Sequence, residues 1–269
     1  MKKLIVASDF SREANHATEY AAQLAAMQES ELILFNLYKP SIHAMNARAS
    51  STSFDELEHS NHREATAVAS IIMEKYGVMI TPYHATGDFF EEIVRCTEAT
   101  SADLLVMGMA PKSIEQELLG NTTTSAIHKL SIPILSVPID SSFNGINKIL
   151  FAYDATHDLP SRALEATHDI AANFGADVEI FNVSEQAEQV FNQEDTQVID
   201  EVMVDVTYYY KNVRSREIVK AIRDEMMDSE SDLLVMAPQK HGFWDSLTHR
   251  SKTSIMASGK TIPLLSIPM

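Results

Sequence analysis

The chain lacks features that several protein classes require. Its 269 residues include one cysteine, Cys96, so no disulfide bond can form within the chain. No apolar run reaches the roughly 20 residues of a membrane-spanning helix, and the short apolar segment at the start ends at Asp9, too early for a signal peptide. We therefore expect a cytoplasmic protein without a membrane segment, in which Cys96 is a buried packing residue and not a nucleophile.

Positive charge is also scarce. Lysine and arginine number 21 against 38 aspartates and glutamates, which gives a formal net charge of -17. Such a surface repels phosphate backbones, so we expect no nucleic-acid partner. The same charge does not exclude one small anion held by backbone N–H groups in a local site. The apolar content of 45% is ordinary for a soluble globular protein.

Several familiar motifs are missing as well. The chain has no G-x-x-x-x-G-K-[ST] loop, no G-x-G-x-x-G turn and no G-x-S-x-G elbow, which disfavours a P-loop ATPase, a standard dinucleotide-binding fold and a serine hydrolase. Among the ten histidines, His59 and His62 stand three residues apart beside Glu58 on an expected helix. That spacing could ligate a metal. A solvated helix face explains it more simply, and we expect no metal site.

What the chain does have is a repeat. Three segments occur twice in the same order, namely residues 3–9 and 148–154, residues 103–107 and 232–236, and residues 132–138 and 262–268. A repeat of this length indicates one module duplicated in tandem. We expect two domains, residues 1–140 and 146–269, joined by a short linker, and each is long enough to bury a core of its own.

Within each module, short apolar segments alternate with segments of helical periodicity. In the first module, Ser11 and Asp88 stand where helix N-caps are expected. The pattern predicts strands at residues 4–8, 32–38, 78–85, 103–107 and 134–137, and at residues 149–153, 178–183, 202–207, 233–236 and 264–267 of the second module. Buried strands that alternate with helices are typical of a doubly wound α/β fold with a parallel sheet.

The second module is the shorter one. The interval from Phe35 to Asp103 is 68 positions, and the matching interval from Phe181 to Asp232 is 51. We therefore expect the second helix of this module to be short or lost, with an acidic connector at residues 185–195. Three consecutive tyrosines stand at residues 208–210. Because side chains alternate along a strand, the middle tyrosine should face away from the other two.

The opening of each module resembles the universal stress protein family. The resemblance lies in Lys3–Ser11 with the alanine-rich helix after it, in Gly87-Asp88 before a helix, in Asp103–Gly108, and in Ile132–Pro138. The resemblance occurs in two copies, which together cover nearly the whole chain. It implies two doubly wound parallel five-stranded sheets of strand order 3-2-1-4-5, Rossmann-like and similar to the adenine nucleotide alpha hydrolases. It also implies that modules pair through their fifth strands, which a tandem chain can do internally as a pseudo-dimer; a further homodimer stays open.

The ATP-binding branch of that family carries a G-x2-G-x9-G-[ST] loop after the fourth strand and an aspartate after the first. Glycines let the backbone approach phosphates, and N–H groups at the next helix hold the anion. The first module reads Gly108-x2-Pro111-x8-Gly120-Asn121, and Pro111 has no N–H to offer. The resemblance implies a modified site for ATP or a related adenine nucleotide, made of Asp9, Gly108, Gly120, Asn121 and Thr122.

The second module departs further from the loop. It reads Ala237-x2-Lys240-x9-Arg250-Ser251, so all three glycines are replaced, although Asp154 remains at the end of the first strand. Arg250 brings a side chain where a phosphate would meet bare backbone. We expect no ATP site of the standard form here, and the locally basic loop is more typical of a solvated surface.

Two functions remain open from the sequence. One is a cytoplasmic tandem stress-response protein that binds a nucleotide in its first module, with at most slow ATP hydrolysis because no general base or magnesium-binding pattern is evident. The other is a nucleotide-independent binding or scaffold protein whose loops are degenerate. A ligand pocket of another kind in the second module is a third, weaker alternative.

Overall fold

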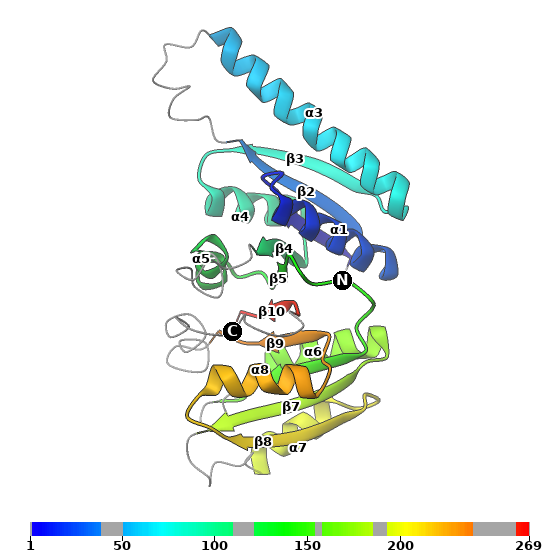
Figure 1. Cartoon of the computed structure of the whole chain (residues 1–269), viewed down its shortest axis with the longest axis vertical. Coiled ribbons are helices and arrows are strands. Elements are labelled where there is room, and N and C mark those ends of the chain that lie inside the picture. Colours follow the sequence, from blue (N-terminus) through cyan, green and yellow to red (C-terminus); the bar gives the residue numbers. More distant parts are fainter. Residues whose placement is uncertain are drawn as a thin grey trace. The chain divides into compact units, whose positions relative to one another are not determined.

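The computed structural model describes residues 2–38, 51–109, 121–153, 158–184, 193–238 and 262–268 (Figure 1). Helices and strands alternate along these residues, which confirms the predicted α/β class. The chain forms two compact units, Met1–Gly108 and Met109–Met269, and each is described by itself. None of the helices in the described ranges has the length and apolarity needed to cross a membrane.

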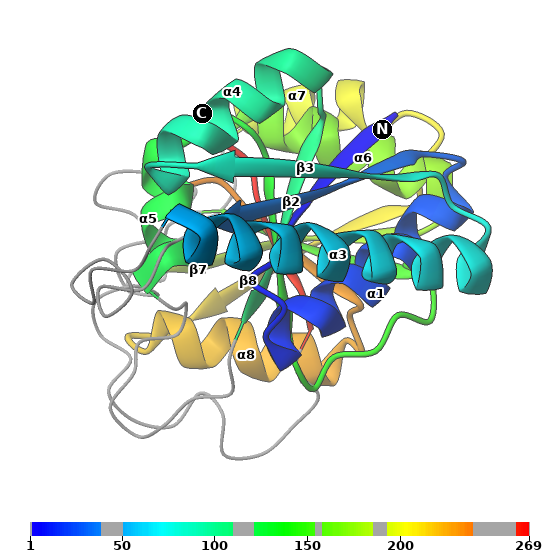
Figure 2. The same ribbon diagram turned by 90° about the horizontal axis from the view of Figure 1, so that it is seen from above.

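The first unit is a parallel sheet with helices on both faces. Its strands follow the order β3-β2-β1-β4. The elements are β1 (Lys3–Ala7), α1 (Arg12–Met27), β2 (Glu31–Tyr38), α3 (Ser51–Tyr76), β3 (Ile80–Thr86), α4 (Phe89–Thr100) and β4 (Leu104–Met109). Helices α1 and α3 contact each other on one face of β2 and β3, and α4 lies on the other (Figure 2).

Both predicted N-caps of this unit are confirmed. The Ser11 hydroxyl accepts a hydrogen bond from the backbone N–H of Ala14 at 3.2 Å. The Asp88 carboxylate accepts from the N–H groups of Phe90 and Glu91 at 2.9 and 3.2 Å. These bonds satisfy N–H groups that a helix leaves without partners in its first turn. They define where α1 and α4 begin.

The second unit contains a mixed sheet in the order β5-β10-β9-β6-β7-β8. Its elements are α5 (Asn121–Lys129), β5 (Ile134–Pro138), β6 (Lys148–Ala152), α6 (Ser161–Phe174), β7 (Asp177–Ser184), α7 (Gln193–Val202), β8 (Tyr208–Arg214), α8 (Ile218–Asp228), β9 (Leu233–Met236) and β10 (Leu264–Ser266). Strand β10 runs parallel to β9 but antiparallel to β5, with Leu265 opposite Leu135.

This mixed pairing differs from the prediction of separate parallel sheets. Strand β5 comes from the first sequence repeat and β10 from the second, and the two hydrogen bond to each other. All residues of both strands are buried, and a buried strand edge without a partner would leave backbone N–H and C=O groups unsatisfied. The fifth strands therefore pair as the family resemblance implied, while the domain boundaries at residues 140 and 146 stay a prediction.

One predicted strand of the second unit is wrong. Residues 202–207 were expected to be a strand. Instead α7 extends to Val202, and the strand is β8, which starts at Tyr208. Glu194 and Asp195 lie in the first turn of α7, where their negative charge suits the positive end of the helix dipole. The helix before this strand is short, as predicted, since α7 has 10 residues and α3 of the first repeat has 26. Of the expected acidic connector at residues 185–195, residues 193–195 belong to α7, and residues 185–192 lie outside the described residues.

The three tyrosines of β8 alternate as predicted. The hydroxyls of Tyr208 and Tyr210 both donate to the carboxylate of Asp200 on α7, at 2.8 and 2.7 Å. The Tyr209 hydroxyl donates instead to Glu179 of β7 at 2.9 Å. Two of the tyrosines thus hold α7 against the sheet, and the third faces the opposite side.

An aspartate at the start of the fourth strand of each repeat anchors the start of the first strand. The Asp103 carboxylate accepts from the backbone N–H groups of Lys2 and Lys3 at 2.6 and 3.1 Å. Asp232 does the same for Asn147 and Lys148 at 2.9 and 3.2 Å. Hydrogen bonds to a charged acceptor are stronger than neutral ones. The aspartates that reveal the repeat in the sequence therefore share one structural role.

We predict that Asp103→Ala lowers the free energy of unfolding by about 1–2 kcal/mol, because two backbone N–H groups lose a charged acceptor. Urea denaturation monitored by circular dichroism measures the change. Glu98→Ala, at an exposed position of α4, is the control and should change stability by less than about 0.5 kcal/mol. Equal losses in the two variants would contradict an anchoring role for Asp103.

Candidate functional site

The carboxyl ends of β1 and β4 lie side by side in the first unit. Ala7 stands opposite Met107 in these neighbouring parallel strands, so the residues that follow, Ser8 and Gly108, continue at the same edge of the sheet. Strand β1 lies between β2 and β4, which is the point where the order of a doubly wound sheet reverses. Ligands of open α/β sheets bind at such points.

Asp9 is held in a defined turn at this edge. The backbone N–H of Ser8 donates to the Phe35 carbonyl at 2.8 Å, and the Asn36 side chain donates to the Ser8 carbonyl at 2.8 Å. The Asp9 carboxylate accepts from the N–H of Ser11 at 3.1 Å and is exposed. Phe10 completes the turn with a positive φ of 61°. The turn presents an exposed carboxylate that can accept hydrogen bonds from a ligand.

Gly108 lies against the backbone of α1. A Cβ at this position would stand 2.4 Å from the Glu13 carbonyl oxygen and 2.6 Å from its carbon. Real side chains do not approach backbone that closely, so only glycine allows α1 and β4 to pack at this distance. The glycine that sequence comparison places in a phosphate loop is therefore required by helix packing.

The structure brings together two of the five predicted site residues. Asp9 and Gly108 lie in the first unit, at adjacent strand ends. Asn121 and Thr122 begin α5 in the second unit, and Thr122 is exposed. Gly120 lies outside the described residues, as do Pro111, Asp154 and the loop from Lys240 to Ser251.

Asn36 is a residue of this edge that sequence reasoning missed. It is 2% exposed, and while its amide nitrogen holds the Ser8 carbonyl, its Oδ1 atom has no protein hydrogen-bond partner. A polar side chain inside the otherwise apolar stretch Leu32–Leu37 was the available signal. Buried polar atoms usually have hydrogen-bond partners. The Oδ1 atom of Asn36 is therefore a buried acceptor near the carboxyl end of β2, next to the turn that holds Asp9.

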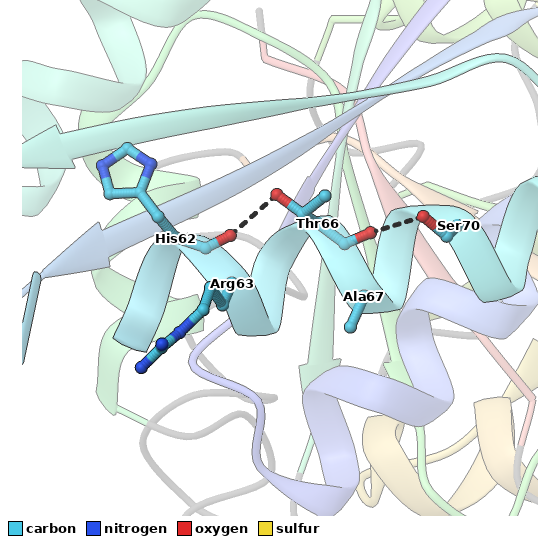
Figure 3. A pocket seen from close by; sticks show the side chains of 5 residues that line it. All are labelled: His62, Arg63, Thr66, Ala67 and Ser70. Carbon is cyan, nitrogen blue, oxygen red and sulfur yellow. Dashed lines mark hydrogen bonds between the residues drawn. The ribbon is translucent and has the colours of Figure 1, made fainter. Parts of the chain in front are cut away.

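Two hollows lie along α3. The larger, about 360 Å³, faces His62, Arg63, Thr66, Ala67 and Ser70 (Figure 3). Its two hydroxyls donate to helix carbonyls, from Thr66 to His62 at 2.8 Å and from Ser70 to Thr66 at 2.9 Å. These side chains all belong to one helix and show no convergent polar groups, so this hollow lacks the features of a specific site.

The two histidines considered in the sequence, His59 and His62, are both exposed on α3, as expected of a solvated helix face. The ring of His62 lies on the ring of His84 from β3, with centroids 3.6 Å apart. Both line a second hollow of about 220 Å³ with Tyr38, Asn61 and Thr86. Within the described ranges, no three histidine, cysteine, aspartate or glutamate side chains are grouped to hold a metal ion.

Cys96 is a packing residue, as predicted. It is fully buried in α4, and burial raises the pKa of its thiol to about 11. A thiol with so high a pKa forms little thiolate at neutral pH, so it is a poor nucleophile.

Comparison with known proteins decides the family. The model of the universal stress protein family matches residues 1–138. The chain belongs to the universal stress protein family. A universal stress protein of Methanocaldococcus jannaschii is 28% identical over 138 residues, which cover 51% of this chain and 81% of that protein.

Solved structures share the fold over nearly the full length of the chain. One, a universal stress protein from Archaeoglobus fulgidus, has a TM-score of 0.76 with 16% identity, and the alignment covers 99% of this chain and 98% of that one. A protein of unknown function from Pseudomonas aeruginosa has a TM-score of 0.60 with 14% identity, over 100% and 92% of the two chains. At these identities the likeness concerns the fold alone.

We predict that Gly108→Ala destabilises this universal stress protein by about 1–3 kcal/mol, because the new methyl group must displace the start of α1. Ala237, the matching residue of the second repeat, provides the control: Ala237→Gly should lower stability by no more than about 1 kcal/mol, through added freedom of the unfolded chain. Thermal and urea unfolding measure both. An unchanged stability of Gly108→Ala would show that α1 does not pack as closely as described.

Proposed function

We propose that the first repeat binds ATP or a related adenine nucleotide at the carboxyl edge of β1 and β4, and that this tandem universal stress protein responds to the nucleotide. The observation that carries the proposal is the turn at Asp9, which holds an exposed carboxylate beside Gly108 at the reversal point of the sheet. A carboxylate in this position suits the hydroxyl groups of a ribose.

The phosphates require donors other than Gly108. That glycine is needed where α1 packs, and Ser11 already caps the start of α1. The remaining residues of the family loop are Gly120, Asn121 and Thr122, and the N–H groups at the start of α5 suit an anion. In a chain of net charge -17, such backbone donors have to offset a repulsive surface. We propose that these three residues hold the phosphates, with hydrolysis slow at most.

A second candidate function is a binding or scaffold protein that uses no nucleotide. One observation favours it, namely that close packing against Glu13 accounts for Gly108 without any ligand. Pro111 in the first loop and the replacement of all three motif glycines in the second loop agree with this alternative. The two candidates differ in whether the isolated protein binds ATP.

We further propose that the repeats, residues 1–140 and 146–269, form an internal pseudo-dimer in the cytoplasm. The antiparallel pairing of β5 with β10 supports this arrangement. Association of two such chains into a homodimer is compatible with it.

The nucleotide proposal predicts about one ATP site per chain by isothermal titration calorimetry, measured with and without Mg²⁺. Asp9→Ala should weaken binding by about tenfold or more, as expected for the loss of a charged hydrogen-bond acceptor. Gly120→Arg should abolish binding, because a long side chain would occupy the position of the phosphates.

The control is Asp169→Asn, which changes an aspartate that is 77% exposed on α6. It should bind ATP as the parent does, and circular dichroism should show that all variants are folded. If the parent gives no heat and no thermal shift with ATP, the nucleotide proposal is wrong and the scaffold function remains.

A further inference from the structure

A glutamate stands in the first half of strand β7, where the strand is buried. Glu179 is 1% exposed, and its neighbours Val178 and Ile180 are fully buried. Its Oε2 atom accepts from the Tyr209 hydroxyl at 2.9 Å and lies 3.9 Å from Nζ of Lys148. Its Oε1 atom has no protein hydrogen-bond partner. Charged side chains are rarely buried this completely unless they are well paired.

Helix α8 places a second carboxyl group near the first. Glu225 is 6% exposed and accepts from Nζ of Lys211 at 2.6 Å. Burial first, and then the neighbouring Glu225, raise the pKa of Glu179, whereas Tyr209 and Lys148 act in the opposite direction. Glu225 already has a close cation in Lys211, and Glu179 has only the more distant Lys148. The oxygen of Glu179 without a partner is therefore better accommodated when that carboxyl is protonated.

The first repeat shows that the fold does not need carboxyl groups here. Register places Ile33 opposite Ile5 in the first repeat and Glu179 opposite Leu150 in the second. On the helix, Cys96 stands seven residues before Asp103, as Glu225 stands seven before Asp232. Ile33 is 6% exposed and Cys96 is fully buried. Two positions that are buried and apolar in the first repeat are thus buried and acidic in the second.

We infer that Glu179 and Glu225 form a buried proton-binding site that makes the packing of α8 against β7 depend on pH. The other charged and titratable groups around it are Lys148 of β6, Asp177 of β7, Tyr209 and Lys211 of β8, and Asp228 of α8. When the proton leaves, two carboxylates face each other across the strand and the helix. The site lies in the first half of β7, away from the carboxyl ends of the strands, so it does not depend on the proposed nucleotide site.

The sign of the pH dependence follows from the raised pKa of Glu179. The folded protein holds the proton more tightly than the unfolded chain, whose glutamate has the ordinary pKa of 4.5. The stabilisation is therefore complete below pH 4.5 and is lost as the pH rises through the higher pKa of the folded state. As the pH rises, the packing of α8 against β7 should weaken before that of the other helices.

The test compares the melting temperatures of the parent and of Glu179→Gln from pH 4.5 to pH 9. Glutamine keeps the shape and cannot ionise, so the variant should lack the decline. The parent should fall relative to it by about 2–4 °C, the shift that a change of roughly 1 kcal/mol produces in a protein of this size. Glu217→Gln, whose side chain is 72% exposed at the start of α8, should follow the parent at every pH.

Two further measurements keep the inference open to refutation. In the parent, amide hydrogen exchange of α8, corrected for its intrinsic pH dependence, should quicken more than that of α6 as the pH rises from 4.5 to 9. The double variant Glu179→Ile with Glu225→Cys restores the residues of the first repeat and should show no such change. Parallel melting curves for the parent and Glu179→Gln, or uniform exchange in α6 and α8, would overturn the proposal.

Discussion

The backbone edges of the two fifth strands are the constraint on which the second unit depends. Strands β5 and β10 are short and buried throughout, so their N–H and C=O groups cannot turn to water. Pairing them with each other, in the antiparallel direction, satisfies these facing edges at once. The rest of that sheet, from β9 to β8, is parallel and builds outward from this one antiparallel contact.

In the first unit, packing alone accounts for a glycine that the sequence assigned to ligand binding. In the sequence, Gly108 stands where the family's phosphate loop begins. In the structure its missing side chain leaves room for the Glu13 carbonyl. A residue type can therefore persist in a motif for a reason unrelated to the ligand. The nucleotide proposal accordingly rests on Asp9 and on the start of α5, and Gly108 contributes the geometry that brings α1 close to β4.

Local signals predicted the fold well where one residue acts on its own neighbours. Ser11 and Asp88 cap helices as expected, and the tyrosines of β8 alternate as a strand requires. Long-range pairing was harder. The mixed sheet depends on contacts between β5 and β10. The apolar residues at 202–207 suggested a strand, but the strand begins only at Tyr208, where the tyrosines bond to Asp200 of α7. For the site, the sequence indicated Asp9. The role of Asn36, which donates to the Ser8 carbonyl, could not be predicted because it depends on β2 lying beside β1.

The pairing of the two fifth strands has a consequence for how the protein behaves on dilution. Two separate modules joined by the same contact would dissociate as their concentration fell, whereas partners on one chain meet at a fixed effective concentration. A partner on the same chain is also encoded separately, so a change in one copy is not imposed on the other. Carboxyl groups could thus replace Ile33 and Cys96 in a single copy, which a symmetric pair of identical chains could never do.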